Sequence, residues 1–330
     1  MRAPTMGAAI ALIIVAALAG AQGEPEIREG PDLVVLVHHP YPDTADPLGF
    51  PYDGAGFNGT GYYQQKYAIF DKENDGFAYP HLVVDGILPV EGLPDPQRPY
   101  QATYDAYQGV LKQRLQEEAA AALEVRTQVA ADQVLVAAQV LPSGPMPGEH
   151  LEAWMALVED NVRYEPPPAV SNGVVNHRFT VRAITNLGTI DLSQGTPAQL
   201  TAAFRMQPAW EREQLHIAFW LQQGASYGTR FDANEVAQAT IHPVQDNVVT
   251  RQTVKAVLME GLSATWCLTC LYGDTVLEDL AQQHGYAVAA KPESTGYWRP
   301  PTHWGIAILA LVGAAALALP RIRRDHEDKP

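Results

Sequence analysis

The chain has 330 residues, enough for about two domains that each bury a core. Hydrophobic residues make up 47% of it and charged residues 18%, which excludes wholesale disorder. The formal net charge is −15 and no long basic run precedes the C-terminus, so the composition argues against nucleic acid as a partner and fits an acidic, soluble ectodomain.

The N-terminus has the pattern of a secretory signal. Arg2 precedes an apolar run over residues 8–19, and small residues follow it. We expect residues 1–22 to be a signal peptide, with an uncleaved N-terminal anchor as the alternative. In both cases the bulk of the chain is exported.

Short strands are predicted next. The β-branched run "DLVVLV" at 32–37 predicts a buried strand. A Pro- and Gly-rich loop follows, with a glycosylation sequon at Asn58 whose use stays open. Residues 62–71 are compatible with a helix.

A hairpin and a long helix come after this loop. "AYPHLVVDGIL" predicts a strand at 81–84 and a hairpin turn at Asp85-Gly86. Apolar residues at helical spacing predict a helix over 100–124.

The pattern then changes to short stretches of alternating apolar and polar residues. Such stretches, separated by turn residues, predict an antiparallel sandwich of immunoglobulin-like type. The seven candidate strands are 123–131, 133–142, 151–160, 177–184, 199–206, 214–223 and 235–243.

Near its end the chain returns to a strand–turn–helix pattern. "TVKAVLMEGL" predicts a strand, and residues 267–284 predict a helix. The uncharged segment 303–320 follows aromatic residues and precedes arginines, which predicts a single membrane-spanning helix with the ectodomain outside.

Cys267 and Cys270 are the only cysteines, and they lie where the last strand meets its helix. A bridge between them closes a very small loop, so it restricts the unfolded chain little and makes a poor structural staple. The positive end of a helix stabilises a thiolate, which is the reactive form of cysteine. The spacing therefore favours a functional thiol pair.

The run "VLMEGLSATWCLTC" resembles the first strand and active site of thioredoxin-fold oxidoreductases, most closely exported reductase-type members. The remaining parts that this resemblance implies lie at the other end of the ectodomain: the strand at 33–37, the helix at 62–71, the "AYPHLVVDGI" segment and the helix at 100–120. The chain also resembles a bacterial outer-membrane-protein-related family that joins a thioredoxin-like domain to an immunoglobulin-like one. This resemblance covers most of residues 33–285.

The expected fold class is accordingly an α/β thioredoxin-like domain, permuted and built from both ends of the ectodomain, plus an all-β immunoglobulin-like sandwich and one C-terminal transmembrane helix. Closure of the permuted domain between two chains by domain swapping is an alternative. The expected segments are a signal peptide (1–22), the first thioredoxin-like part (23–120), the sandwich (121–245), the second thioredoxin-like part (246–291), a linker (292–302), the membrane helix (303–320) and a cytoplasmic tail (321–330).

The resemblance also implies roles for particular residues. Cys267 is the nucleophile and Cys270 the resolving thiol. Pro80 is expected to be cis, with the backbone of Tyr79 facing the sulfurs to bind a substrate segment. Trp266 shields one side.

A proton acceptor is less well defined. Thioredoxins carry a buried acid six residues before the first cysteine, where this chain has Gly261. Glu260 lies one residue earlier, and a one-residue shift in a strand moves a side chain to the other face. Glu260 is therefore a candidate proton acceptor only.

His38 and His39 follow the strand expected beside the cysteine strand. Two cysteines with one or two histidines can bind copper or zinc, as in exported copper-delivery proteins of similar fold. Adjacent strand residues point in opposite directions, so we expect at most one of these histidines to face the sulfurs.

The leading hypothesis is a membrane-anchored thiol-disulfide oxidoreductase outside the cytoplasm, favouring the reductase or isomerase direction and needing no cofactor. Its expected partners are exported protein thiols or disulfides and a candidate electron donor in the membrane. The alternatives are a copper-binding chaperone that uses Cys267, Cys270 and His38 or His39, and an adhesion or binding module with redox-silent thiols.

Overall fold

A computed structural model describes residues 25–39, 48, 66–67, 79–143, 151–164, 172–192, 195–223 and 234–286. The expected signal peptide, the sequon at Asn58, most of the expected helix at 62–71, the linker, the membrane helix at 303–320 and the tail lie outside these residues.

The largest element is an eight-stranded mixed sheet. Its strands, in spatial order, are β13 (Val236–Pro243), β12 (Leu215–Gln223), β7 (Leu151–Glu159), β10 (Thr180–Ile190), β2 (Leu33–His38), β15 (Val257–Leu262), β3 (His81–Val84) and β4 (Leu88–Glu91).

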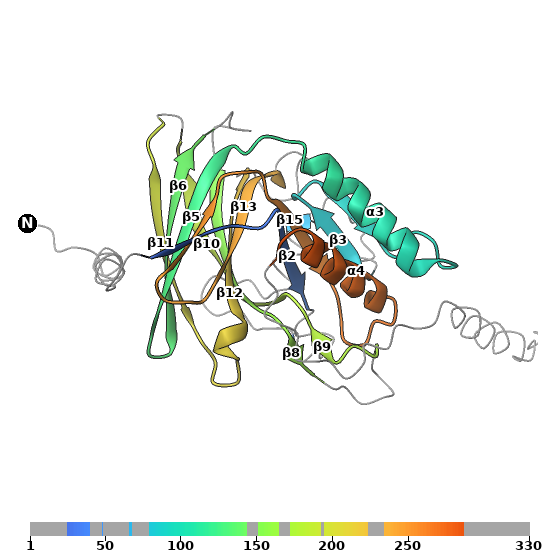
Figure 1. Ribbon diagram of the computed structural model, residues 1–330. Helices are drawn as coiled ribbons and strands as arrows, with labels where there is room; N and C mark the ends of the chain where they lie inside the picture. Colours follow the sequence, from blue (N-terminus) through green and yellow to red (C-terminus); the bar gives the residue numbers. More distant parts are fainter. Residues whose placement is uncertain are drawn as a thin grey trace, which may run out of the picture.

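A second sheet of five strands covers part of the first (Figure 1). Its order is β1 (Glu26–Glu29), β14 (Val248–Gln252), β5 (Ala121–Ala130), β6 (Gln133–Pro142) and β11 (Ala198–Arg205). A two-stranded ladder joins β8 (Val162–Arg163) to β9 (Asn176–His177), and η3 (Arg212–Gln214) is a single turn of 3-10 helix. All seven strands predicted for the sandwich are present.

Strand β7 is buried on both faces, because one hydrophobic core lies on each side of it. Ala153, Met155 and Leu157 belong to the core between the two sheets. The alternate residues Trp154 and Val158 belong to the second core, which continues under β2 and β15. The uninterrupted apolar pattern of this strand follows from that position.

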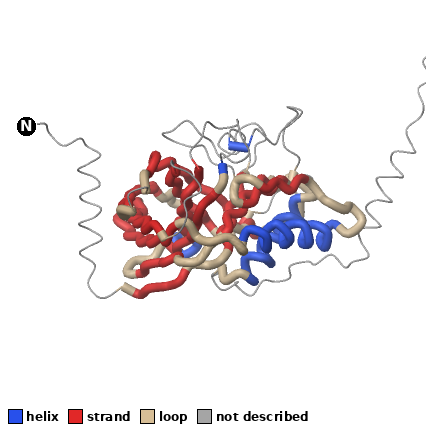
Figure 2. Tube along the Cα trace, turned by 90° about the horizontal axis from the view of Figure 1, so that it is seen from above, coloured by secondary structure: helices blue, strands red, loops and turns tan. Residues whose placement is uncertain are grey.

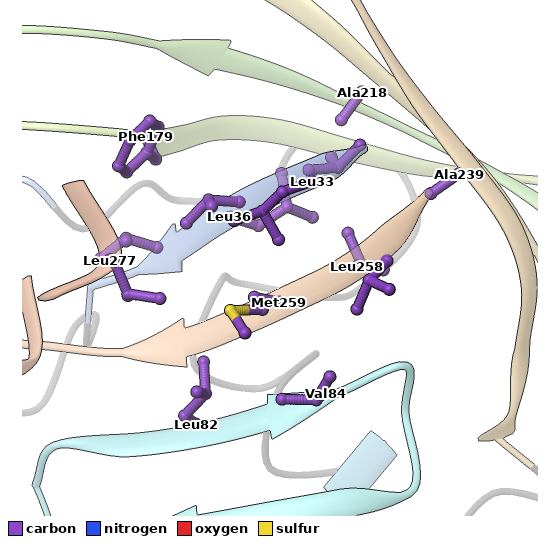
Figure 3. Packing of buried hydrophobic residues seen from close by; sticks show 14 of the residues in the cluster. Leu33, Leu36, Leu82, Val84, Phe179, Ala218, Ala239, Leu258, Met259 and Leu277 are labelled. Atoms are coloured by element: carbon purple, nitrogen blue, oxygen red, sulfur yellow. The ribbon is translucent and has the colours of Figure 1, made fainter. Parts of the chain in front are cut away.

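The two ends of the described chain meet in the parallel pair β2–β15. The register runs from Val257 opposite Leu33 to Leu262 opposite His38, which confirms the predicted pairing. β3 pairs antiparallel on the far side of β15 and turns into β4 at Asp85 and Gly86, as expected for the hairpin. Figure 3 shows buried side chains meeting around β2 and β15, among them Leu36, Met259, Leu82, Phe179 and Leu277.

Helices α3 (Pro99–Arg114) and α4 (Cys270–Gln283) lie side by side next to this end of the sheet (Figure 2). The Tyr104 hydroxyl donates to Oε1 of Gln283 at 2.8 Å, and the Tyr100 hydroxyl donates to Asp279. α3 ends ten residues earlier than predicted, because the alanine run that follows it enters β5 at Ala121.

The predicted fold class is wrong. The prediction was an α/β domain beside a separate sandwich. The described part of the chain is instead mainly β-structure, and α3 and α4 are the two α-helices that it defines. One sheet runs through both expected units, because β10 pairs in parallel with β2 at Thr180 and Val37. Local patterns predict strands but do not reveal which strand edges join.

The expected transmembrane helix also has no support in the structure. Within the described ranges, no helix is long and apolar enough to cross a membrane.

We predict that replacing Leu36 by alanine lowers the free energy of unfolding by about 2–5 kcal/mol, because Leu36 is fully buried at the centre of the continuous sheet. Urea denaturation followed by circular dichroism measures this. Val254→Ala is the control: Val254 is 57% exposed, and the change should cost less than about 0.5 kcal/mol. A Leu36→Ala chain as stable as the control would contradict the assigned core.

Candidate functional site

The two cysteines lie in the connection from β15 to α4 and form a disulfide with an S–S distance of 2.09 Å. Cys270 begins α4 and is fully buried, whereas Cys267 lies in the preceding turn and is 6% exposed. The more accessible sulfur is therefore the one expected to be the nucleophile.

Hydrogen-bond groups surround the Sγ atom of Cys267. The backbone N–H of Cys270 donates to it at 3.1 Å, and the Thr269 hydroxyl lies 3.3 Å away. These groups stand at the N-terminal end of α4, where the helix dipole favours negative charge. In the reduced chain, the Cys270 N–H group and this end of the helix would stabilise a thiolate on Cys267.

The Tyr79–Pro80 segment adjoins the disulfide, and its peptide bond is cis. The Thr269 hydroxyl donates to the Tyr79 carbonyl at 2.9 Å, and the Tyr79 and Trp266 rings lie 5.3 Å apart. Tyr79 also packs against both cysteines. The structure thus brings together Trp266, Tyr79 and the cysteine pair, as expected.

Gly273 lets α4 approach Pro80 closely, and the sequence analysis did not single it out. A Cβ atom at this position would lie 3.1 Å from Cβ of Pro80 and 3.2 Å from the Tyr107 hydroxyl. A glycine inside a helical pattern is the signal that points to such a close approach.

Glu260 lies on the other face of the sheet from α4. Its strand neighbour Gly261 faces Leu277 of α4, and side chains alternate along a strand. The Glu260 carboxylate contacts Nζ of Lys66 at 2.5 Å and Nε2 of His38 at 3.3 Å. It also accepts a hydrogen bond from the Tyr67 hydroxyl. Among the described residues, neither cysteine contacts it.

These contacts determine the charge of the cluster. Burial raises the pKa of Glu260, but Lys66 and His38 outweigh burial and lower it to about 2. Burial lowers the pKa of His38, and Glu260 offsets this only in part. At neutral pH, Glu260 is therefore a carboxylate. Burial lowers the pKa of its partner Lys66, and Glu260 opposes that shift. The contact with Lys66 suits an ion pair better than a proton acceptor.

His38 and His39 diverge, as alternation along a strand requires. His38 joins the Glu260 cluster, while the His39 ring lies 5.6 Å from the His177 ring. In the part of the chain that the structure describes, no three His, Cys, Asp or Glu side chains are grouped so that they could hold a metal ion. The described residues thus do not bring His38, His39, Cys267 and Cys270 together into the metal site that was the alternative hypothesis.

No protein-family model matches the chain, and no curated protein matches it. Among solved structures, HBP35 of Porphyromonas gingivalis is similar with a TM-score of 0.38 and 12% identity, over 54% of this chain and 57% of that one. The match thus spans little more than half of either chain, and a TM-score this low carries no argument about fold or function.

We predict that the free energy of unfolding of Glu260→Gln falls less steeply with decreasing pH than that of the parent chain. Because the folded-state pKa lies below the ordinary value of 4.5, ionised Glu260 stabilises the fold above about pH 4.5, and this contribution is lost as the pH falls toward 2. The shift corresponds to about 3 kcal/mol. Urea denaturation from pH 7 to pH 2 measures it, with exposed Glu118→Gln as the control.

The same change should lower stability at pH 7 by about 3–5 kcal/mol, since it leaves a buried ammonium without this carboxylate. Glu260→Gln combined with Lys66→Met should recover most of that loss. An unchanged pH dependence in Glu260→Gln would show that Glu260 does not ionise as described.

Proposed function

We propose that this chain is a thiol-disulfide oxidoreductase in which Cys267 is the nucleophile and Cys270 the resolving thiol. The observation that carries the proposal is the Cys267–Cys270 disulfide at the start of α4, with the backbone N–H of Cys270 donating to the more exposed sulfur at 3.1 Å. The resemblance of "WCLTC" to thioredoxin-type redox motifs belongs to the same proposal.

In the reducing direction, the Cys267 thiolate attacks one sulfur of a partner disulfide. A mixed disulfide forms, and the other partner sulfur leaves as a thiolate that takes up a proton. Cys270 then loses its proton and attacks the Cys267 sulfur, which releases the second partner thiolate. Two electrons have passed to the partner and the chain is left with its own disulfide, which a donor dithiol must reduce for another cycle.

The small size of the disulfide loop supports a redox role over a structural one. A loop of this length stabilises a fold by roughly 2 kcal/mol in the chain-entropy model, compared with about 4.7 kcal/mol for a 100-residue loop. The bridge therefore contributes less to stability than one that joined distant parts of the chain would.

The surroundings of Cys267 suit contact with another polypeptide. Its two sequence neighbours, Trp266 and Leu268, are 39% and 68% exposed. Large apolar side chains exposed beside a reactive group are typical of a binding surface. We assign Trp266, Tyr79 and Pro80 to this substrate-facing surface.

Further parts of the proposal rest on sequence alone. The pattern at 1–22 favours export, so we propose that the chain acts outside the cytoplasm. Leu268 and Thr269 between the cysteines favour the reductase or isomerase direction by resemblance. The proposed partners are exported proteins with thiols or disulfides.

We predict that Cys270→Ser traps partner proteins. Without the resolving thiol, the mixed disulfide on Cys267 persists, so reductant-sensitive complexes should accumulate in cells expressing the full chain. Acid quenching, alkylation and non-reducing electrophoresis detect these complexes.

The matched control is the double variant Cys267→Ser/Cys270→Ser, which keeps the same serine at 270 and should trap nothing. If the single variant traps no more than the double variant while both remain folded, the proposed function is wrong.

A further inference from the structure

A segment of the sandwich lies against the thiol site. It comprises residues 160–179 between β7 and β10, carries the short strands β8 and β9, and is described at 160–164 and 172–179 (Figure 1). We call it the 160–179 segment. It contacts the β15–α4 connection at Asn172 and α4 itself at Arg178.

Asn172 bonds to the connection between β15 and α4 that contains Cys267, which we call the thiol turn. Its side-chain amide donates to the Ala264 carbonyl at 3.2 Å, and its backbone N–H donates to the Thr265 carbonyl at 2.9 Å. Its side-chain oxygen accepts the backbone N–H of Val174 at 2.9 Å. Asn172 is only 4% exposed, so these bonds form away from competing water.

The carbonyl that Asn172 holds is also bonded to the nucleophile. The backbone N–H of Cys267 donates to the Ala264 oxygen at 3.0 Å. On the other side of Cys267, Thr269 is fixed to the Tyr79 carbonyl. Two segments far away in sequence thus hold the thiol turn from both sides.

A buried ion pair network fixes the 160–179 segment itself. Arg178 contacts Asp160 with Nε at 2.5 Å and Nη2 at 2.7 Å, and its Nη1 lies 3.2 Å from Glu278 of α4. Bidentate Arg–carboxylate pairs have a defined geometry. The segment that carries Asn172 is therefore itself bonded to α4, and this contact positions Asn172 beside the thiol turn.

We propose that Asn172 is a positioning residue for Cys267, which makes the described residues 172–179 part of the redox site. This inference rests on the proposed function. Asn172 fixes the Ala264 and Thr265 carbonyls, these fix the turn, and the turn sets the approach of the Cys270 N–H group to the Cys267 sulfur. A looser turn weakens that hydrogen bond and destabilises the thiolate.

Asn172→Asp tests this with almost no change in shape. The aspartate keeps an oxygen for the Val174 N–H group but loses the donor to Ala264. In the reduced Cys270→Ser chain Cys267 is the single thiol, so the pH dependence of its alkylation by iodoacetamide reports its thiolate. Asn172→Asp should move the alkylation midpoint upward by about half a pH unit or more and slow disulfide exchange by about threefold to tenfold.

Asn247→Asp is the matched control. It makes the same chemical change at an exposed turn between β13 and β14, so midpoint and rate should stay as in the parent chain. The charge of the aspartate alone would raise the pKa of a nearby thiol, so the neutral variant Asn172→Ser, which also lacks the amide donor, must move the midpoint in the same direction. The proposal is overturned if a folded Asn172 variant keeps the parent midpoint and exchanges within about twofold of the parent rate.

The two proposals fail in different ways. A parent chain that exchanges no disulfides, but whose alkylation midpoint moves with the neutral variant Asn172→Ser, would contradict the proposed function and support the positioning role.

Discussion

The parallel pairing of β2 with β15 is the constraint on which the rest of the structure depends. It joins the first described apolar strand to the last, residue by residue, across more than two hundred positions of sequence. Because β2 also pairs with β10 and β15 with β3, this one pair links the sandwich strands to the β3–β4 hairpin. The thiol turn leaves β15 at the edge of the sheet where β2 also ends and where β3 and β10 begin.

Buried charges specify how these elements meet. Asp85 in the hairpin turn accepts the backbone N–H of Leu258 at 2.8 Å and pairs with Arg114 of α3 and with Lys255 before β15. On the face of the sheet away from α4, Glu260 pairs with Lys66. Buried pairs of this kind add little net stability, but separating them is costly, so an arrangement that parts them is disfavoured. They favour one arrangement of segments distant in sequence.

The thiol site depends on the same meeting of distant segments. Cys267 and Cys270 come from the β15–α4 connection, Tyr79 and Pro80 from the entry to β3, and Asn172 from the 160–179 segment. Hydrogen bonds between these segments, 2.9 Å from Thr269 to Tyr79 and 3.2 Å from Asn172 to Ala264, define the surroundings of the Cys267 sulfur. No single stretch of the chain could supply this geometry.

The sequence predicted the local elements well. Alternating patterns predicted seven sandwich strands, Asp85-Gly86 predicted the hairpin, and the strand pattern at 33–37 led to the correct partner for β15. The joining of the sheets could not be predicted, because any exposed strand edge can pair with β2 and no residue marks β10 as its partner. The ion pair of Glu260 with Lys66 and the bonds of Asn172 were missed for a related reason: their partners are fixed by tertiary packing, and a lone polar residue in sequence does not name its partner.

The central claim is that the Cys267–Cys270 pair exchanges electrons while the surrounding fold stays intact. Equilibration of the purified chain in glutathione buffers of stepped ratio, with the reduced fraction read by alkylation and mass spectrometry, tests this directly. The account predicts a reversible two-electron transition with the same circular dichroism spectrum at both ends. A disulfide that resists reduction until the chain unfolds, or a chain that unfolds on reduction, would contradict it.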